Sequence, residues 1–179
     1  MRNMMRKQKS SIEALIDLLP DKQKNVFQEI ACYLVELGYI PQKQQVKDYV
    51  LSFKHQVNGK VIAKMGFRKQ NGFVSVRFFA CKDVPEKYVD ALRRDLDAQN
   101  EQYSGPRNSR PASGITSQCG YCGDICTGGR LGYAYKYPDG REITRCGAYP
   151  IVIPDVKESD VAEMKKVILE QHQFFLSIA

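Results

Sequence analysis

The stretch YVLSFKHQVNGKVIAKMGFRKQNGFVSVRFFA, residues 49–80, decides the fold. Apolar and polar side chains alternate along it with a period of two, which is typical of half-buried β-strands. Asn58-Gly59 interrupts the alternation once and Asn71-Gly72 interrupts it again, and both dipeptides favour tight turns. The stretch therefore predicts a meander of three antiparallel strands.

The alternation gives this meander a core face and an opposite face. The residues expected on the core face are Tyr49, Leu51, Phe53, His55, Val61, Ala63, Met65, Phe67, Val74, Val76, Phe78 and Ala80. Those expected on the opposite face are Val50, Ser52, Lys54, Gln56, Lys60, Ile62, Lys64, Arg68, Phe73, Ser75, Arg77 and Phe79. The opposite face is thus expected to carry cations interleaved with aromatic rings.

Helical periodicity flanks the meander on both sides. A short helix is expected before Pro20, and a second is expected between Asp21, which can cap it, and the stop signal Gly38. A third helix should begin after Asp83, and a terminal one should cover residues 160–178. The apolar positions behind these predictions are Ile12, Leu15, Ile16, Leu19, Val26, Phe27, Ile30, Ala31, Leu34, Leu37, Tyr88, Val89, Leu92, Leu96, Val161, Met164, Ile168, Phe175 and Ile178.

Composition divides the chain of 179 residues into segments of one domain. Residues 1–10 are expected to form a basic flexible tail, and residues 11–102 an α+β core. Residues 103–118 are rich in Ser, Gly and Pro, which predicts a mobile connector. Residues 119–179 contain a cysteine-rich hairpin, with its turn at residues 138–140, and the terminal helix. Because two strands and one helix do not easily form a core alone, this segment should complete the same domain by joining or covering the meander. The expected fold class is α+β with an antiparallel sheet.

The cysteine spacing C-x2-C-x3-C-x19-C indicates a metal site. A closed shell of four thiolates suits a structural zinc ion, and the ligands expected are Cys119, Cys122, Cys126 and Cys146. A redox dithiol, an iron-sulfur cluster and unliganded thiols are the alternatives. No apolar run approaches the ~20 residues that cross a bilayer. No secretion signal follows the basic N-terminus, so a reducing cytoplasm without a membrane partner is expected.

Two histidines, His55 and His172, limit the acid-base chemistry that the chain can offer. Each is expected to be partly buried with one hydrogen-bond partner, and the minority alternative is that one replaces Cys126 as a zinc ligand. The sequence contains no catalytic triad order, H-E-x-x-H motif or phosphate loop. An enzyme is therefore the less favoured class.

The opposite face of the meander is the best candidate for a ligand surface. Cations hold phosphate groups and aromatic rings stack on bases, and the residues singled out for this role are Lys54, Lys64, Arg68, Arg77, Phe73 and Phe79. A face that is merely solvated, or covered by the C-terminal hairpin, is the competing interpretation. The net charge of +7 is concentrated in the N-terminal tail and this sheet.

Several blocks of the chain resemble a group of small uncharacterised proteins of Gram-positive, Firmicutes-type bacteria. The blocks are CGYC, YAYKYPDG, RCGAYPIVIP, EQHQFF, LGY, LSFKH, AKMGFRK and VRFFA. The resemblance covers most of the chain and implies a cytosolic α+β protein with a cysteine cluster. It carries over Cys119, Cys122 and Cys146, and it brings no established activity or catalytic residue.

Two function classes follow from these observations. The preferred one is a non-enzymatic binding or regulatory module with a structural zinc site, which binds a small acidic ligand on its basic sheet face. The alternative is a nucleic-acid-binding protein that uses the basic sheet and the N-terminal tail. A recognised nucleic-acid motif is missing and the helices carry acids, which places the alternative second.

Overall fold

A computed structural model describes residues 10–78, 88–91, 93, 94, 97, 132–136, 139, 140, 142–146, 150–153 and 155–177. Its strands are β1 (Tyr39–Lys43), β2 (Tyr49–His55), β3 (Val61–Arg68), β4 (Asn71–Val76), β5 (Gly132–Lys136), β6 (Glu142–Cys146) and β7 (Ile151–Ile153). Its helices are α2 (Asp21–Glu36), the short 3₁₀ helix η2 (Glu158–Asp160) and α4 (Val161–Ser177). Residues 10–16 and the described residues of 88–97 are helical as well. The predicted α+β class with an antiparallel sheet is therefore confirmed.

The main sheet has the strand order β1-β2-β3-β4-β7, and every neighbouring pair is antiparallel. The meander β2-β3-β4 was predicted, but β1 was not. Pro41 lies inside β1, opposite Phe53, and a proline argues against a central strand because it lacks an N–H donor. β1 is an edge strand, where that missing donor is tolerated.

The C-terminal hairpin and the strand that follows it belong to different sheets. β5 and β6 pair with each other in a separate two-stranded sheet, in which Gly132 is opposite Cys146. The continuation of this segment, β7, is the part that joins the main sheet, beside β4. Both edges of the main sheet are thus short strands.

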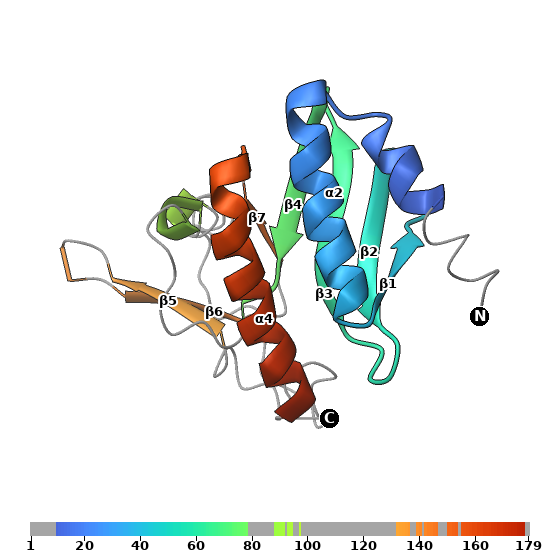
Figure 1. The fold of residues 1–179 in the computed structure, drawn as a ribbon. Helices are drawn as coiled ribbons and strands as arrows, with labels where there is room; N and C mark the ends of the chain where they lie inside the picture. The colour runs from blue at the N-terminus through green and yellow to red at the C-terminus, as the bar shows by residue number, and fades with distance from the viewer. Residues whose placement is uncertain are drawn as a thin grey trace.

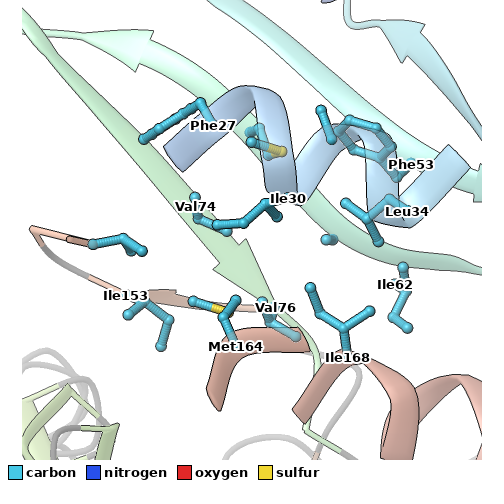
Figure 2. Close-up of a cluster of buried hydrophobic side chains, with 14 of the residues drawn as sticks. Phe27, Ile30, Leu34, Phe53, Ile62, Val74, Val76, Ile153, Met164 and Ile168 are labelled. Atoms are coloured by element: carbon cyan, nitrogen blue, oxygen red, sulfur yellow. The ribbon is translucent and has the colours of Figure 1, made fainter. Parts of the chain in front are cut away.

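Helices α2 and α4 lie side by side on one face of the main sheet (Figure 1). Their apolar stripes meet the sheet residues in a single core, in which Ile30 and Leu34 of α2 and Met164 and Ile168 of α4 surround Val76 (Figure 2). Residues from both ends of the chain therefore share this core. Its other large, fully buried side chains are Leu15, Phe27, Tyr39, Leu51, Phe53, Ile62, Met65, Phe78, Tyr88 and Phe175.

The turn between β3 and β4 lies two residues earlier in the chain than the sequence predicted. Asn71 and Gly72 were expected to form it, but both belong to β4, opposite Arg68 and Phe67 respectively. The turn is formed by Lys69 and Gln70, whose φ angles are +48° and +64°. Two successive left-handed residues define a turn that normally favours Asn-Gly.

Close packing against α2 explains this shift. A Cβ atom added at Gly72 would lie 2.6 Å from Leu19 Cδ2 and 2.6 Å from Phe27 Cζ. The backbone N–H of Gly72 also donates to Gln23 Oε1 at 3.0 Å. Gly72 is thus required where the sheet approaches the helix, and the turn falls two residues earlier on poorer turn formers.

A β-bulge corrects the predicted orientation of Ile62. The register of β2 against β3 shifts between Phe53 and Lys54, so that Phe53 is opposite Ala63 whereas Lys54 is opposite Val61. The extra residue turns Ile62 into the core, where it is fully buried, although simple alternation placed it on the opposite face.

Of two further predicted signals, the cap at Asp21 is wrong, and the turn at Asn58-Gly59 is present within a longer loop. Asp21 does not cap α2, because Pro20 occupies the N-cap position and Asp21 is the first helical residue, paired with Lys24 at 2.7 Å. The Asn58-Gly59 reversal is present, but its loop begins directly after His55, and the Gly59 N–H donates to the His55 carbonyl at 3.0 Å. Among the described residues, no helix is long and apolar enough to span a membrane.

Candidate functional site

The sheet face turned away from α2 and α4, here called the outer face, has a lysine at its centre. Lys64 on β3 is opposite Ser52 on one side and Ser75 on the other. The same row continues to Gln42 on β1 and to Val152 on β7, at the two edges of the sheet. Lys64 is therefore the charged residue of this row, and the two residues beside it are small serines.

The outer face is exposed at both ends of this row. Val152 is 54 % exposed and Gln42 is also exposed, so neither edge of the row is covered. In the middle of the row, Ser52 and Ser75 are each only 3 % exposed and Lys64 is half-buried. The hydroxyl of Ser52 is also fixed, since it accepts from Gln44 Nε2 at 2.6 Å and donates to the Gln42 carbonyl at 3.3 Å.

Lys64 is half-buried at the centre of the row. In the described part of the chain, no carboxylate forms an ion pair with Lys64. A lysine without an acidic partner among the described residues can attract an incoming anion.

An aromatic ring lies beside this lysine. Phe73 on β4 is opposite Gly66 on β3, and a Cβ atom added at Gly66 would lie 2.8 Å from Phe73 Cε1. The ring therefore occupies the space that a side chain at residue 66 would fill, an arrangement in which an aromatic ring covers a strand glycine. The guanidinium carbon of Arg68 lies 5.6 Å from the centre of the same ring.

Arg68 is held in place by an acidic neighbour. Its Nε donates to Asp48 Oδ2 at 2.6 Å, and its side chain is 58 % exposed. The hydrogen bond uses Nε, so the two terminal Nη groups keep their N–H donors for another acceptor. The Asp48 carboxylate reduces the net charge here, and it also orients the guanidinium near Phe73.

Three residues of the predicted surface share the outer face of β3 and β4: Lys64, Phe73 and Arg68. Lys54 is exposed on the same face, beyond the bulge. Arg77 corrects the prediction, because it is only 8 % exposed and so does not belong to an open basic surface. It follows the last residue of β4, and its backbone N–H donates to the Ile62 carbonyl at 3.0 Å, beside the bulge. Phe79 lies outside the described residues.

The predicted zinc ligands fall mostly outside the described residues. Cys119, Cys122 and Cys126 are not among them, and Cys146 is described only as the last residue of β6. In the described ranges, no three His, Cys, Asp or Glu side chains form a group able to hold a metal ion. The zinc site therefore stays a prediction. Cys32 is an exposed free thiol on α2, and its Sγ accepts from Gln28 Nε2 at 3.2 Å.

The structure brings the two histidines together, which the sequence did not predict. The ring centres of His55 and His172 are 5.6 Å apart, and Tyr39 contacts both rings, with centre distances of 5.0 and 5.7 Å. The Tyr39 hydroxyl lies 3.3 Å from His172 Nδ1. Tyr39 begins β1, the strand that was not predicted, so no sequence signal pointed to this Tyr39–His55–His172 cluster.

The cluster favours the uncharged forms of His172 and Tyr39. Burial lowers the pKa of His172, and the neighbouring His55 lowers this pKa further. Burial also raises the pKa of Tyr39. The Asn58 backbone N–H donates to His55 Nδ1 at 3.5 Å, and the Asn58 side chain donates to the Phe175 carbonyl at 3.4 Å. The cluster thus connects the C-terminal part of α4 to the sheet.

Comparison of the chain with protein families, curated proteins and solved structures finds no match in any of the three. The resemblance to the Firmicutes-type group stays a prediction.

Proposed function

We propose that the protein is a non-enzymatic binding or regulatory module that holds a small acidic ligand on its outer face, with a structural zinc ion in the cysteine segment. The observation that supports the ligand site is Lys64, which lies half-buried in the middle of the outer face between two small hydroxyl side chains. Its lack of a described acidic partner leaves one positive charge to be neutralised from outside.

The groups around Lys64 suit an anion with several oxygens. The ammonium group of a lysine offers three rotatable N–H donors, and Arg68 adds a planar guanidinium on the same face of β3. Phe73 between them offers an apolar surface instead of another donor. This combination favours a phosphate or carboxylate that is attached to an apolar or aromatic body.

Titration with inorganic tripolyphosphate, followed by amide chemical shifts, tests the ligand site. Lys64→Gln should weaken binding by about tenfold, the loss expected for one charge-assisted contact at a partly exposed position. The matched control is Lys166→Gln, which removes an exposed lysine of α4 from the other layer of the fold and should leave binding unchanged. Equal affinities for the Lys64→Gln and Lys166→Gln proteins would refute the proposed site.

A further inference from the structure

We infer that the acidic ligand of the outer face is a single strand of nucleic acid that runs along β3, with one base stacked on Phe73. This inference rests on the proposed function and narrows its ligand class. It follows from the spacing of Lys64, Phe73 and Arg68, and from the charges beyond them.

The three side chains are evenly spaced along one strand. Lys64, Gly66 and Arg68 are alternate residues of β3 and share its outer face, and the Phe73 ring covers Gly66. A strand rises by about 3.3 Å per residue, so the Cα atoms of successive outer positions are about 6.7 Å apart. The Cα atoms of Lys64 and Arg68 are therefore about 13 Å apart. The order along β3 is therefore cation, ring, cation.

This spacing fits a strand better than a small anion. A stacked nucleic-acid strand advances by about 3.4 Å per nucleotide, so the two cations span about four stacked nucleotides, and fewer in an extended strand. Phosphates at both ends and a base between them would match the order on β3. Aromatic side chains that lie between cations in a groove are the usual means of binding single strands without sequence preference.

Positive charge continues past the end of β3. Lys69 is exposed in the β3–β4 turn, and Lys47 is exposed in the loop that leads to β2. The two segments meet there, because Asp48 of this loop binds Arg68. Lys43 is not part of this surface, because it is opposite the core residue Leu51 and its Nζ lies 4.6 Å from the centre of the Tyr49 ring. A small acidic ligand at Lys64 would not use the charges of Lys69 and Lys47, whereas a longer strand would.

The basic N-terminal sequence joins the chain at the same end of the sheet. The Tyr49 hydroxyl donates to the Ser11 carbonyl at 3.0 Å, which places the start of the described chain at this end of the sheet, on the side of the helices. The nine residues before Ser10 contain four basic residues and no acidic residue. Their positive charge raises the attraction of the whole chain for a polyanion.

A duplex and a lipid surface fit this face less well. The bases of a duplex are stacked on each other, so a ring on a flat sheet does not reach their faces, and β3 is a central strand that does not protrude into a groove. A lipid surface would use the charges but would not use the ring that covers Gly66. The single strand alone uses both the cations and Phe73.

Fluorescence anisotropy of a labelled ten-nucleotide RNA strand tests the inference, with tripolyphosphate, a duplex of equal length and phosphatidylserine vesicles as the other arms. We expect a Kd on the order of 10⁻⁴ to 10⁻⁶ M at physiological salt and a salt slope of about −0.7 for each phosphate contacted. Phe73→Leu should weaken binding of the RNA about tenfold and leave tripolyphosphate binding unchanged. Lys64→Gln should weaken binding of both.

Two controls separate the ring from a general loss of structure. Phe174→Leu replaces a partly buried phenylalanine of α4 and should not change RNA binding. Phe73→Tyr keeps a ring over Gly66 and should keep the RNA affinity. On the unmodified protein, RNA should shift the NMR signals of the Phe73 ring protons and tripolyphosphate should not, a result that does not depend on any variant folding.

The outcomes distinguish this inference from the proposed function. If tripolyphosphate binds through Lys64 but RNA binds no more tightly, or the Phe73 ring signals do not respond to RNA, the single-strand assignment fails and the small-ligand function stands. Tighter binding of the duplex or of the vesicles would also overturn the assignment. If neither anion binds, both proposals fail.

Discussion

Replacing Gly72 by alanine should destabilise the protein, although alanine is the better residue for an ordinary strand. The added Cβ would lie 2.6 Å from Leu19 Cδ2 and from Phe27 Cζ, and 2.9 Å from Gln23 Oε1, whereas ordinary contacts begin at 3.4 Å. Leu19 is 4 % exposed and Phe27 is 1 % exposed, so both are confined by the core. The helix and the sheet must therefore move apart by several tenths of an ångström.

The expected change in the free energy of unfolding is the sum of three contributions, two destabilising and one stabilising. Overpacking of a filled core costs about 1–3 kcal/mol. Loss of the Gln23 hydrogen bond to the Gly72 N–H adds about 0.5–1.5 kcal/mol. Removing glycine from a strand returns about 0.5–1 kcal/mol through the lower entropy of the unfolded chain. The net expectation is a loss of about 2 kcal/mol, which lowers the Tm of a protein of this size by about 4–8 °C.

Urea denaturation of a double-mutant cycle measures this effect and its cause. Gly72→Ala, Leu19→Ala and the double variant are compared with the unmodified protein. If the new methyl group clashes with Leu19, Gly72→Ala should destabilise the Leu19→Ala protein less than it destabilises the unmodified protein. The difference between the two losses should be at least about 0.5 kcal/mol. An unchanged or higher stability of Gly72→Ala would refute the packing argument, and so would strict additivity of the two substitutions.

Three further predictions concern other parts of the chain. Gln70→Gly should stabilise the protein by about 0.5–1 kcal/mol, because glycine adopts the left-handed conformation of residue 70 without strain. The control Gln56→Gly, in the other hairpin loop, should not stabilise the protein. Higher stability of the Gln56 variant alone would contradict the assigned turn. The folded-state pKa of His172 is lowered, so the unfolded chain binds the proton more readily and stability should fall as the pH drops below about 6.5. Urea midpoints between about pH 8 and pH 5 should fall less steeply for His172→Gln, and parallel slopes would refute the role of this histidine. Cytosolically expressed protein should hold about one zinc ion by elemental analysis, and Cys119→Ser should lose it while Cys32→Ser retains it; less than a tenth of an equivalent in the unmodified protein would exclude the site.

Local periodicity was enough to identify most elements and most of the core. The stripe from Val26 to Leu34 in α2 and the alternation from Leu51 to Val76 in the meander are properties of neighbouring residues. They depend on the fixed geometry of a helix or a strand, which any such segment has before it packs. The candidate ligand residues Lys64, Arg68 and Phe73 could be found in the same way, because each belongs to a regular strand.

The largest corrections involve contacts between different elements of the fold. The best turn dipeptide, Asn71-Gly72, was displaced from the turn because α2 needs a glycine beneath it. A bulge reversed Ile62, and Arg77 beside it is buried although its alternation marked it as exposed. No local pattern records either effect.

The sequence by itself determined the fold class, the helices and the basic character of one sheet face, since these follow from the spacing of residue types along the chain. The tertiary structure decided the register of β3 against β4 and the approach of His55 to His172, which are 117 residues apart. It also decided which cations remain open on the outer face. The physical reason is that register and exposure depend on which surfaces fit together, and a fit between two surfaces is not a property of either segment alone.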